Sequence, residues 1–129
     1  MSVASNNTAT STPSPIPCGE ILYRLLTKAS WLPQDGGVAA AAFYRRSDED
    51  GISVFIASAC PLEEARTLLA RVKGIATLHT GRIRDLGLDV VPDPEDRRHA
   101  EIVGVPLSDE DLDGANYFAD LLAEQARIA

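Results

Sequence analysis

Hydrophobic and polar positions alternate most clearly in residues 52–58, ISVFIAS, which are rich in β-branched and aromatic side chains. A period of two places successive side chains on opposite faces, so this segment is predicted to be a β-strand. Short apolar runs predict further strands at 75–79, 88–91 and 99–105, the last of which is expected to be the final strand. Residues 20–27, EILYRLLT, are also predicted as a strand, because the run is short and precedes the loop-like WLPQDGG.

Residues 38–45, VAAAAFYR, give two conflicting signals. Four alanines favour a helix. Eight residues between a Gly-Gly turn and a charged turn have the length of a strand. We predict a strand on the length argument, and SDEDG at 47–51 then becomes the turn of an antiparallel hairpin over 38–58.

Apolar residues at helical spacing predict two amphipathic helices. The first covers 61–73, with an apolar stripe of Leu62, Ala65, Leu68, Leu69 and Val72. The last helix is predicted to begin at Ser108, whose side chain can cap it. Its buried stripe is expected to contain Leu112, Ala115, Phe118, Ala119 and Leu122. Residues 81–87 are predicted to form a turn or a single helical turn, and the prolines of VPDP are expected to end the strand at 88–91.

Together these elements predict an α+β fold, with a small, mostly antiparallel sheet and two amphipathic helices on one face. A length of 129 residues fits one domain. Residues 1–17 carry no charge and consist mostly of Ser, Thr, Asn, Ala and Pro, which bury too little apolar surface to offset their ordering entropy. We therefore predict a disordered leader over 1–18 and a single domain over 19–129.

The formal charge of −7 is unevenly distributed along the chain. Residues 89–124 carry eleven Asp and Glu against two Arg, a net of −9. Such a surface repels nucleic acid and anionic lipid, so neither is an expected partner. The acids form either a solvated face that maintains solubility or a docking face for a basic protein partner. In the second case, the candidate partner-binding residues are Asp93, Asp96, Asp109, Asp113 and Asp120.

Several function classes lack their signatures in this sequence. No apolar run reaches the ~20 residues of a membrane span. The N-terminus has no basic patch followed by an apolar stretch, so a cytoplasmic location is expected. The motifs GxGxxG, GxxxxGK[ST], GxSxG and HExxH and the EF-hand loop do not occur. We therefore expect no cofactor, and no motif assigns a catalytic residue.

His79 and His99 are the only histidines, and each lies at an end of a predicted strand. If the two strands are neighbours, both rings can reach one site, where Asp93, Glu95 or Asp96 could complete a metal-ligand set. The spacing matches no zinc pattern, so no metal site is predicted.

Arg82 and Arg84 follow Gly81 in HTGRIRDLG. Alternate residues of an extended segment share a face, so the two guanidiniums could together bind a carboxylate or a phosphate of a small ligand. The alternative is that they pair with the protein's own acids, such as Asp85 or Glu101.

The order of the segments AAAAFYR, GISVFIAS, GRIRDLGLDVVPDP and HAEIVGVP, followed by a closing helix, resembles a set of small bacterial proteins of unassigned function. This resemblance covers residues 22–125 and implies a stand-alone domain.

A second likeness is to the RES-type toxins that degrade NAD, whose fold is similar to that of ADP-ribosyltransferases. It rests on LYR at 22–24, the Gly-Gly pair and ISVFIASACPLEEA at 52–65. The resemblance implies that Arg24 matches the family's Arg and that Glu63 or Glu64 matches its Glu. Tyr44 is a poor match to the family's Tyr, and Gly36-Gly37 is followed by Val-Ala in place of the family's signature.

Two functions follow as expectations. The first is a small acidic interaction or accessory protein without enzymatic activity. The alternative is a small enzyme of the ADP-ribosyltransferase or RES-like type that acts on NAD or another small anionic ligand. For that alternative, the candidate ligand-binding residues are Arg24, Glu64, His79, Arg82, Arg84 and His99.

Overall fold

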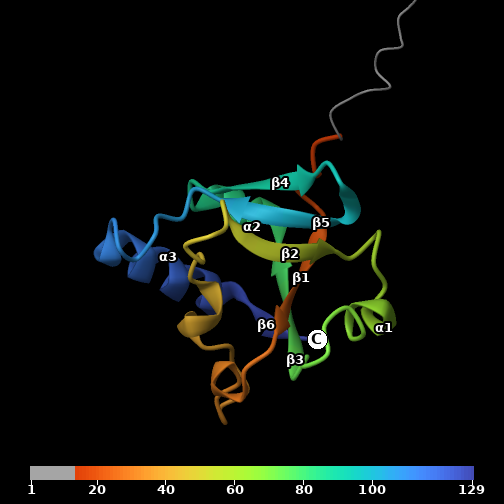
Figure 1. The fold of residues 1–129 in the computed structure, drawn as a ribbon, viewed down its shortest axis with the longest axis horizontal. Helices are drawn as coiled ribbons and strands as arrows, with labels where there is room; N and C mark the ends of the chain where they lie inside the picture. Colours follow the sequence, from red (N-terminus) through yellow and green to blue (C-terminus); the bar gives the residue numbers. More distant parts are fainter. Residues whose placement is uncertain (1–13) are drawn as a thin grey trace, which may run out of the picture.

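The computed structural model describes residues 14–129, which form an antiparallel sheet with helices on both of its faces (Figure 1). The sheet has six strands in the order β4-β5-β2-β1-β3-β6. The strands are β1 (Ile21–Leu26), β2 (Ile52–Ile56), β3 (Gly74–His79), β4 (Asp89–Asp93), β5 (Asp96–Val103) and β6 (Arg127–Ile128). The predicted α+β class with an antiparallel sheet is confirmed.

Three α-helices and two 3-10 turns accompany the sheet within these residues: η2 (Ala29–Trp31), η3 (Ala40–Phe43), α1 (Leu62–Ala65), α2 (Thr80–Asp85) and α3 (Leu112–Gln125). Figure 1 shows α3 and α1 on opposite sides of the sheet, so the prediction that both helices lie on one face is wrong. The reason is that β1 is apolar on both faces. Leu22 packs in the main core with α3, whereas Leu25 packs in a second cluster with α1.

Residues 40–43 form the 3-10 turn η3 in place of the predicted strand over 38–45. Ala42 and Phe43 are fully buried beneath α3, and the Tyr44 hydroxyl donates a hydrogen bond to the side-chain oxygen of Asn116. The contact with α3 therefore selects the helical backbone that alanine favours over the strand that the segment length suggests. Strand β2 pairs with β1 and β5, so the predicted hairpin over 38–58 is wrong as well.

Helix α1 ends after one turn, so the predicted helix over 61–73 is wrong beyond Ala65. The Thr67 side chain donates to the carbonyl of Glu64 at 2.8 Å, a local bond that competes with helix continuation. The apolar stripe still contributes to packing, because Leu68 and Val72 contact the second cluster from the irregular segment after the helix.

Helix α3 begins at Leu112, and Asp111 rather than the predicted Ser108 is its N-cap, accepting a hydrogen bond from the Gly114 N–H at 2.9 Å. The buried stripe is confirmed for Ala115, Ala119 and Leu122, while Phe118 is half-buried. Leu112, predicted to be buried, is 57% exposed because it lies in the first turn, where the stripe extends beyond the core.

The edges of the sheet account for two further differences. Pro92 lies inside β4 opposite Ala100, although the prolines are predicted to end the strand. Since β4 is an edge strand, a residue without an N–H is tolerated there. The strand predicted to be the last, β5, is followed by the two-residue β6, which pairs with β3 and is too short to show a periodic pattern.

Residues 1–13 of the predicted leader lie outside the described residues, whereas residues 14–18 pack against the domain. Ile16 is 5% exposed in the main core, and the Cys18 carbonyl accepts a hydrogen bond from the Gly81 N–H at 2.8 Å. The buried Ile16 side chain therefore anchors this segment to the core of the domain.

Candidate functional site

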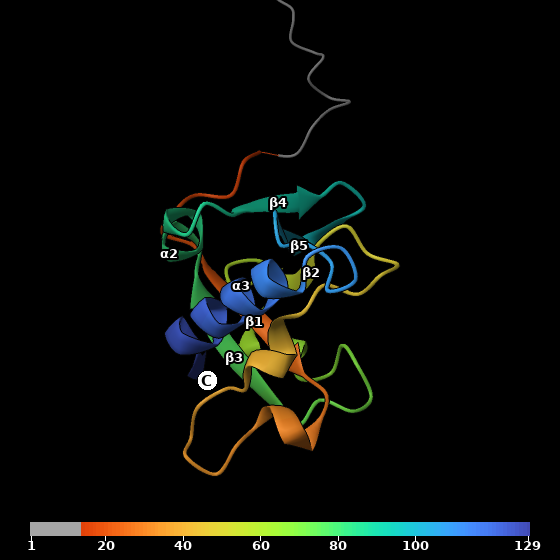
Figure 2. The same cartoon turned by 90° about the vertical axis from the view of Figure 1, so that its left-hand side faces the viewer.

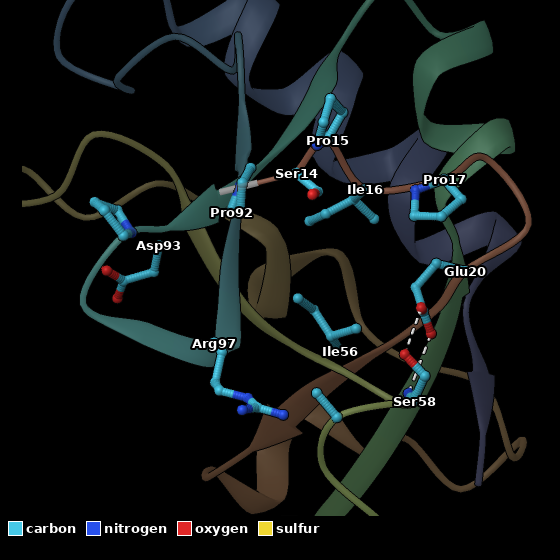
Figure 3. Close-up of a pocket in the computed structure, with 12 residues that line it drawn as sticks. Ser14, Pro15, Ile16, Pro17, Glu20, Ile56, Ser58, Pro92, Asp93 and Arg97 are labelled. Carbon is cyan, nitrogen blue, oxygen red and sulfur yellow. Dashed lines mark hydrogen bonds between the residues drawn. The ribbon is translucent and has the colours of Figure 1, made fainter. Parts of the chain in front are cut away.

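A cavity of about 330 Å³ lies beneath the segment 14–17, with Ile16 and Ile56 among the apolar residues that line it (Figure 3). Two of its polar residues are bonded to each other: Ser58 donates from its hydroxyl and its N–H to the Glu20 carboxylate at 2.7 and 3.2 Å. The Asp93 carboxylate points away from the other labelled side chains in Figure 3. This cavity therefore assembles no group of side chains suited to a reaction.

A larger cavity of about 770 Å³ opens where β1 and β2 diverge. The two strands pair only at Leu22–Ile56 and Tyr23–Phe55, whereas β1 pairs with β3 along its whole length. The turns η2 and η3 lie in the segment that connects β1 to β2, which is drawn in orange and yellow in Figure 2, and they contribute Trp31 and Ala41 to the cavity lining. The cavity is lined by Arg24, Leu25, Thr27, Lys28, Trp31, Ala41, Tyr44, Arg45, Arg46, Glu49, Ser53, Phe55 and Leu69.

Arg24 joins the diverging strands at the wall of this cavity. Its Nε donates to the Ala42 carbonyl at 2.9 Å, and its Nη1 donates to the Ser53 carbonyl at 3.0 Å. The guanidinium carbon also lies 5.5 Å from the centre of the Trp31 ring. Burial lowers the pKa of Arg24 to about 10, although the nearby Glu49 carboxylate acts in the opposite direction. Within residues 14–129, Arg24 makes no ion pair, so its charge is held by carbonyl oxygens and an aromatic ring.

The cavity is positively charged although the chain as a whole is acidic. Its lining contains four basic side chains and a single acidic one, Glu49. The Lys28 ammonium lies 5.7 Å from the Trp31 ring centre, and the buried Nε of Arg45 has no hydrogen-bond partner among the described residues. Arg45 and Arg46 form long ion pairs, with Glu110 at 4.0 Å and with Asp48 at 3.7 Å, and Nη1 of Arg45 also donates to the Asp50 carbonyl at 3.4 Å. A small anion entering this space would meet several donors at once.

A hydrogen-bonded chain of three side chains runs from the wall of this cavity across the sheet. The Ser53 hydroxyl lies 2.6 Å from Nε2 of His99, and Nδ1 of His99 lies 2.9 Å from Oδ2 of Asp93. The three residues come from β2, β5 and β4, which are adjacent strands. The Glu95 N–H and the His99 ring both lower the pKa of Asp93, so its carboxylate is ionised at neutral pH.

The predicted ligand residues do not form one site. Arg24 lines the large cavity, but Glu64 lies outside its lining and is bonded to Arg98 at 2.7 Å. His79 and His99 are separated by β1 and β2 in the sheet, so the two rings do not meet.

Arg82 and Arg84 lie in α2, where residues two apart point in different directions, so the expected shared face is wrong. Arg82 is exposed. Arg84 donates from Nε to Asp89 at 2.8 Å. This contact supports the alternative that the arginine pairs with the protein's own acids, although its partner is Asp89 and not Asp85 or Glu101.

The predicted partner-binding acids separate into two groups. Asp93 is bonded to His99, and Asp96 to Arg98 at 3.2 Å. Asp109, Asp113 and Asp120 are exposed in or next to α3, which lies on the left of Figure 1, whereas the β4–β5 turn lies on the right. A basic protein partner for the α3 acids stays a prediction.

Most residues of the large cavity carry no signal of a site in the amino-acid sequence. Lys28 and Trp31, the Arg45–Arg46 pair, and Ser53 come from three separate segments, and only the folded chain brings them together. The adjacent Arg45 and Arg46 are the one local sign of a binding site, but such a pair is also typical of an exposed turn.

Among residues 14–129 there is no group of three or more His, Cys, Asp and Glu side chains that could hold a metal ion. In the same residues, every helix is too short or too polar to cross a membrane. Comparison of the chain with protein-family models, with curated proteins and with solved structures finds no match.

Proposed function

We propose that this protein binds a small anionic ligand, carrying a carboxylate or a phosphate, in the cavity between the diverging ends of β1 and β2. The observation that carries the proposal is the concentration of Arg24, Lys28, Arg45 and Arg46 around one cavity of about 770 Å³ in a protein with a charge of −7. Within residues 14–129, Arg24 and Lys28 form no ion pair, and Arg45 and Arg46 form only long ones, at 4.0 Å and 3.7 Å. A bound anion would give these cations a closer partner.

The cavity differs from the NAD-degrading site implied by the RES-type resemblance. That site requires an Arg and a Glu together, whereas Glu64 lies outside the lining that contains Arg24. NAD therefore enters the proposal only as one member of the class of small anions.

Trp31 provides a direct measure of binding, because it is the only tryptophan in the chain and it lines the cavity. Two matched pairs of probes separate charge from shape: AMP against adenosine, and benzoate against benzamide. We expect AMP or benzoate to change Trp31 fluorescence saturably, with affinity that falls as salt is added. The uncharged partner of each pair should produce no comparable change. Equal responses to charged and uncharged probes, or no response to any of them, would overturn the proposal.

Lys28→Gln should weaken anion binding by up to about five-fold, the range for one partly exposed charge pair. Lys73→Gln is the matched control, since Lys73 is the only other lysine and lies outside the cavity lining. Isothermal titration calorimetry on both variants gives the affinities without depending on Trp31. Equal losses in the two variants would show that overall charge, and not the cavity, governs binding.

A further inference from the structure

The Ser53–His99–Asp93 chain has the connectivity of a nucleophile, a base and an orienting carboxylate. The Asp93 carboxylate can only accept a hydrogen bond when ionised, so Nδ1 of His99 carries the proton. Nε2 is then an acceptor, and the Ser53 hydroxyl donates to it over 2.6 Å. This tautomer is the one in which a histidine can remove the proton of a serine.

The sheet fixes this arrangement. In the pairing of β2 with β5, Phe55 lies opposite His99 and Ser53 lies opposite Glu101, so Ser53 and His99 are diagonal neighbours on one face. The Phe55 ring packs against the imidazole with centroids 5.2 Å apart. Asp93 approaches from the end of β4, where the pairing with β5 is irregular. A site on adjacent strands holds its geometry more firmly than one on loops.

Ser53 also belongs to the wall of the cationic cavity. The Arg24 guanidinium donates to the Ser53 carbonyl itself, at 3.0 Å. A ligand whose anionic group sits among the basic side chains therefore occupies the cavity that Ser53 also lines. Holding reactants together in this way accelerates a reaction by removing the entropy of encounter.

We propose that Ser53 is a catalytic nucleophile and that the protein hydrolyses carboxylic esters of small anions. This inference rests on the anion site of the proposed function. Ser53 Oγ forms a bond to the acyl carbon while its proton passes to Nε2 of His99, and the ester C–O bond then breaks as His99 returns that proton to the leaving oxygen. Water attacks the acyl-serine, its proton goes to His99 and then to Oγ, and a carboxylic acid is released. Asp93 is a positioning residue that keeps His99 in the required tautomer.

The first test uses a fluorophosphonate, which forms a stable adduct only with an activated serine. Mass spectrometry of the full chain should show one adduct, and peptide mapping should place it on Ser53. Ser53→Ala should abolish the adduct, and His99→Gln should slow its formation about a hundred-fold or more. Ser47→Ala is the matched control, because Ser47 is exposed and outside the hydrogen-bonded chain. No adduct, or an adduct that persists in Ser53→Ala, overturns the proposal.

The pH dependence of labelling in the unaltered chain gives a second measure that requires no variant to fold. The labelling rate should fall in acid, where a protonated imidazole can no longer accept the serine proton. A hydrogen-bonded chain with a purely structural role gives no adduct at any pH, and a labelling rate that does not fall in acid excludes His99 as the base.

The second test compares 4-acetoxybenzoate with its uncharged methyl ester as substrates. We expect kcat/KM to favour the anion at least five-fold, and Lys28→Gln to reduce that preference. If Ser53 is labelled but the two esters react equally, the result supports Ser53 as a nucleophile and contradicts the proposed anion site. If benzoate or AMP binds but neither ester is cleaved and no adduct forms, the result supports the anion site and contradicts the proposal that Ser53 is a nucleophile.

Discussion

The side chain of Arg24 bonds to the main chain of Ser53 at the point where the ladder between β1 and β2 stops. Pairing of the two strands ends at Tyr23–Phe55, and the Nη1 of Arg24 then donates to the Ser53 carbonyl at 3.0 Å. The guanidinium thus supplies a donor where a neighbouring strand would supply an N–H. Because the strands separate here, the sheet gains a cavity without leaving this carbonyl unsatisfied.

Replacing Arg24 should therefore destabilise the fold. Arg24→Met leaves the carbonyls of Ala42 and Ser53 without their donor, and we expect a loss of about 2–4 kcal/mol of unfolding free energy. Arg82→Met, at an exposed arginine of α2, should change stability by less than about 0.5 kcal/mol. Urea unfolding of both variants measures the difference. Equal stabilities would show that Arg24 does not support the diverging strands.

Two leucines of α3 provide a matched test of which helix face is buried. Leu122 is fully buried and Leu112 is 57% exposed. Leu122→Ala should cost about 2–5 kcal/mol through lost burial and the cavity that remains. Leu112→Ala should cost no more than about 0.5 kcal/mol. Thermal or urea unfolding of both variants measures these losses of stability. Comparable losses at the two positions would mean that α3 packs against the core with a different face.

Ile16 tests whether the segment before β1 belongs to the domain. Its side chain is 5% exposed and packs in the main core. Ile16→Ala should therefore cost about 2–4 kcal/mol, as for other buried aliphatic residues. Ile128→Ala is a useful comparison, because Ile128 is 41% exposed in β6. If the melting temperature of Ile16→Ala equals that of the unaltered protein, the segment 14–18 does not contribute to the core.

The ion pair of Arg84 with Asp89 should make the free energy of unfolding depend on pH in the acid range. The Arg84 side chain, assisted by the Val90 N–H, holds the pKa of Asp89 below its usual 3.8. The folded state thus binds this proton less tightly than the unfolded chain. The stabilisation is present above about pH 4 and is lost as the pH falls through the folded-state pKa.

Asp89→Asn should consequently lower stability at neutral pH and flatten its decline in acid. The control is Asp85→Asn, at an α2 carboxylate that forms no ion pair within residues 14–129. Unfolding free energies between about pH 6 and pH 2 measure the effect, which should shrink with added salt because the Asp89 side chain is 59% exposed. Parallel pH profiles for Asp89→Asn and the unaltered chain would contradict this assignment.

Elements with a local hydrophobic pattern can be predicted from the amino-acid sequence alone. Alternation in 52–58 indicated β2, and helical spacing identified the buried stripe of Ala115, Ala119 and Leu122. Both signals depend on the backbone period alone, so no distant residue is needed to read them. The α+β class follows from the same patterns.

Two kinds of feature depend on tertiary contacts: segments in which residue propensity and segment length disagree, and side chains that are distant in sequence but meet in the fold. Residues 40–43 became a helical turn because α3 covers Ala42 and Phe43, which a local pattern does not specify. The sequence identifies His99 as a candidate ligand-binding residue but does not identify its partners. Ser53 and Asp93 lie 46 and 6 positions away and meet His99 through strand pairing. Register between strands, and not sequence spacing, sets these contacts, and a shift of one residue would turn Ser53 to the opposite face.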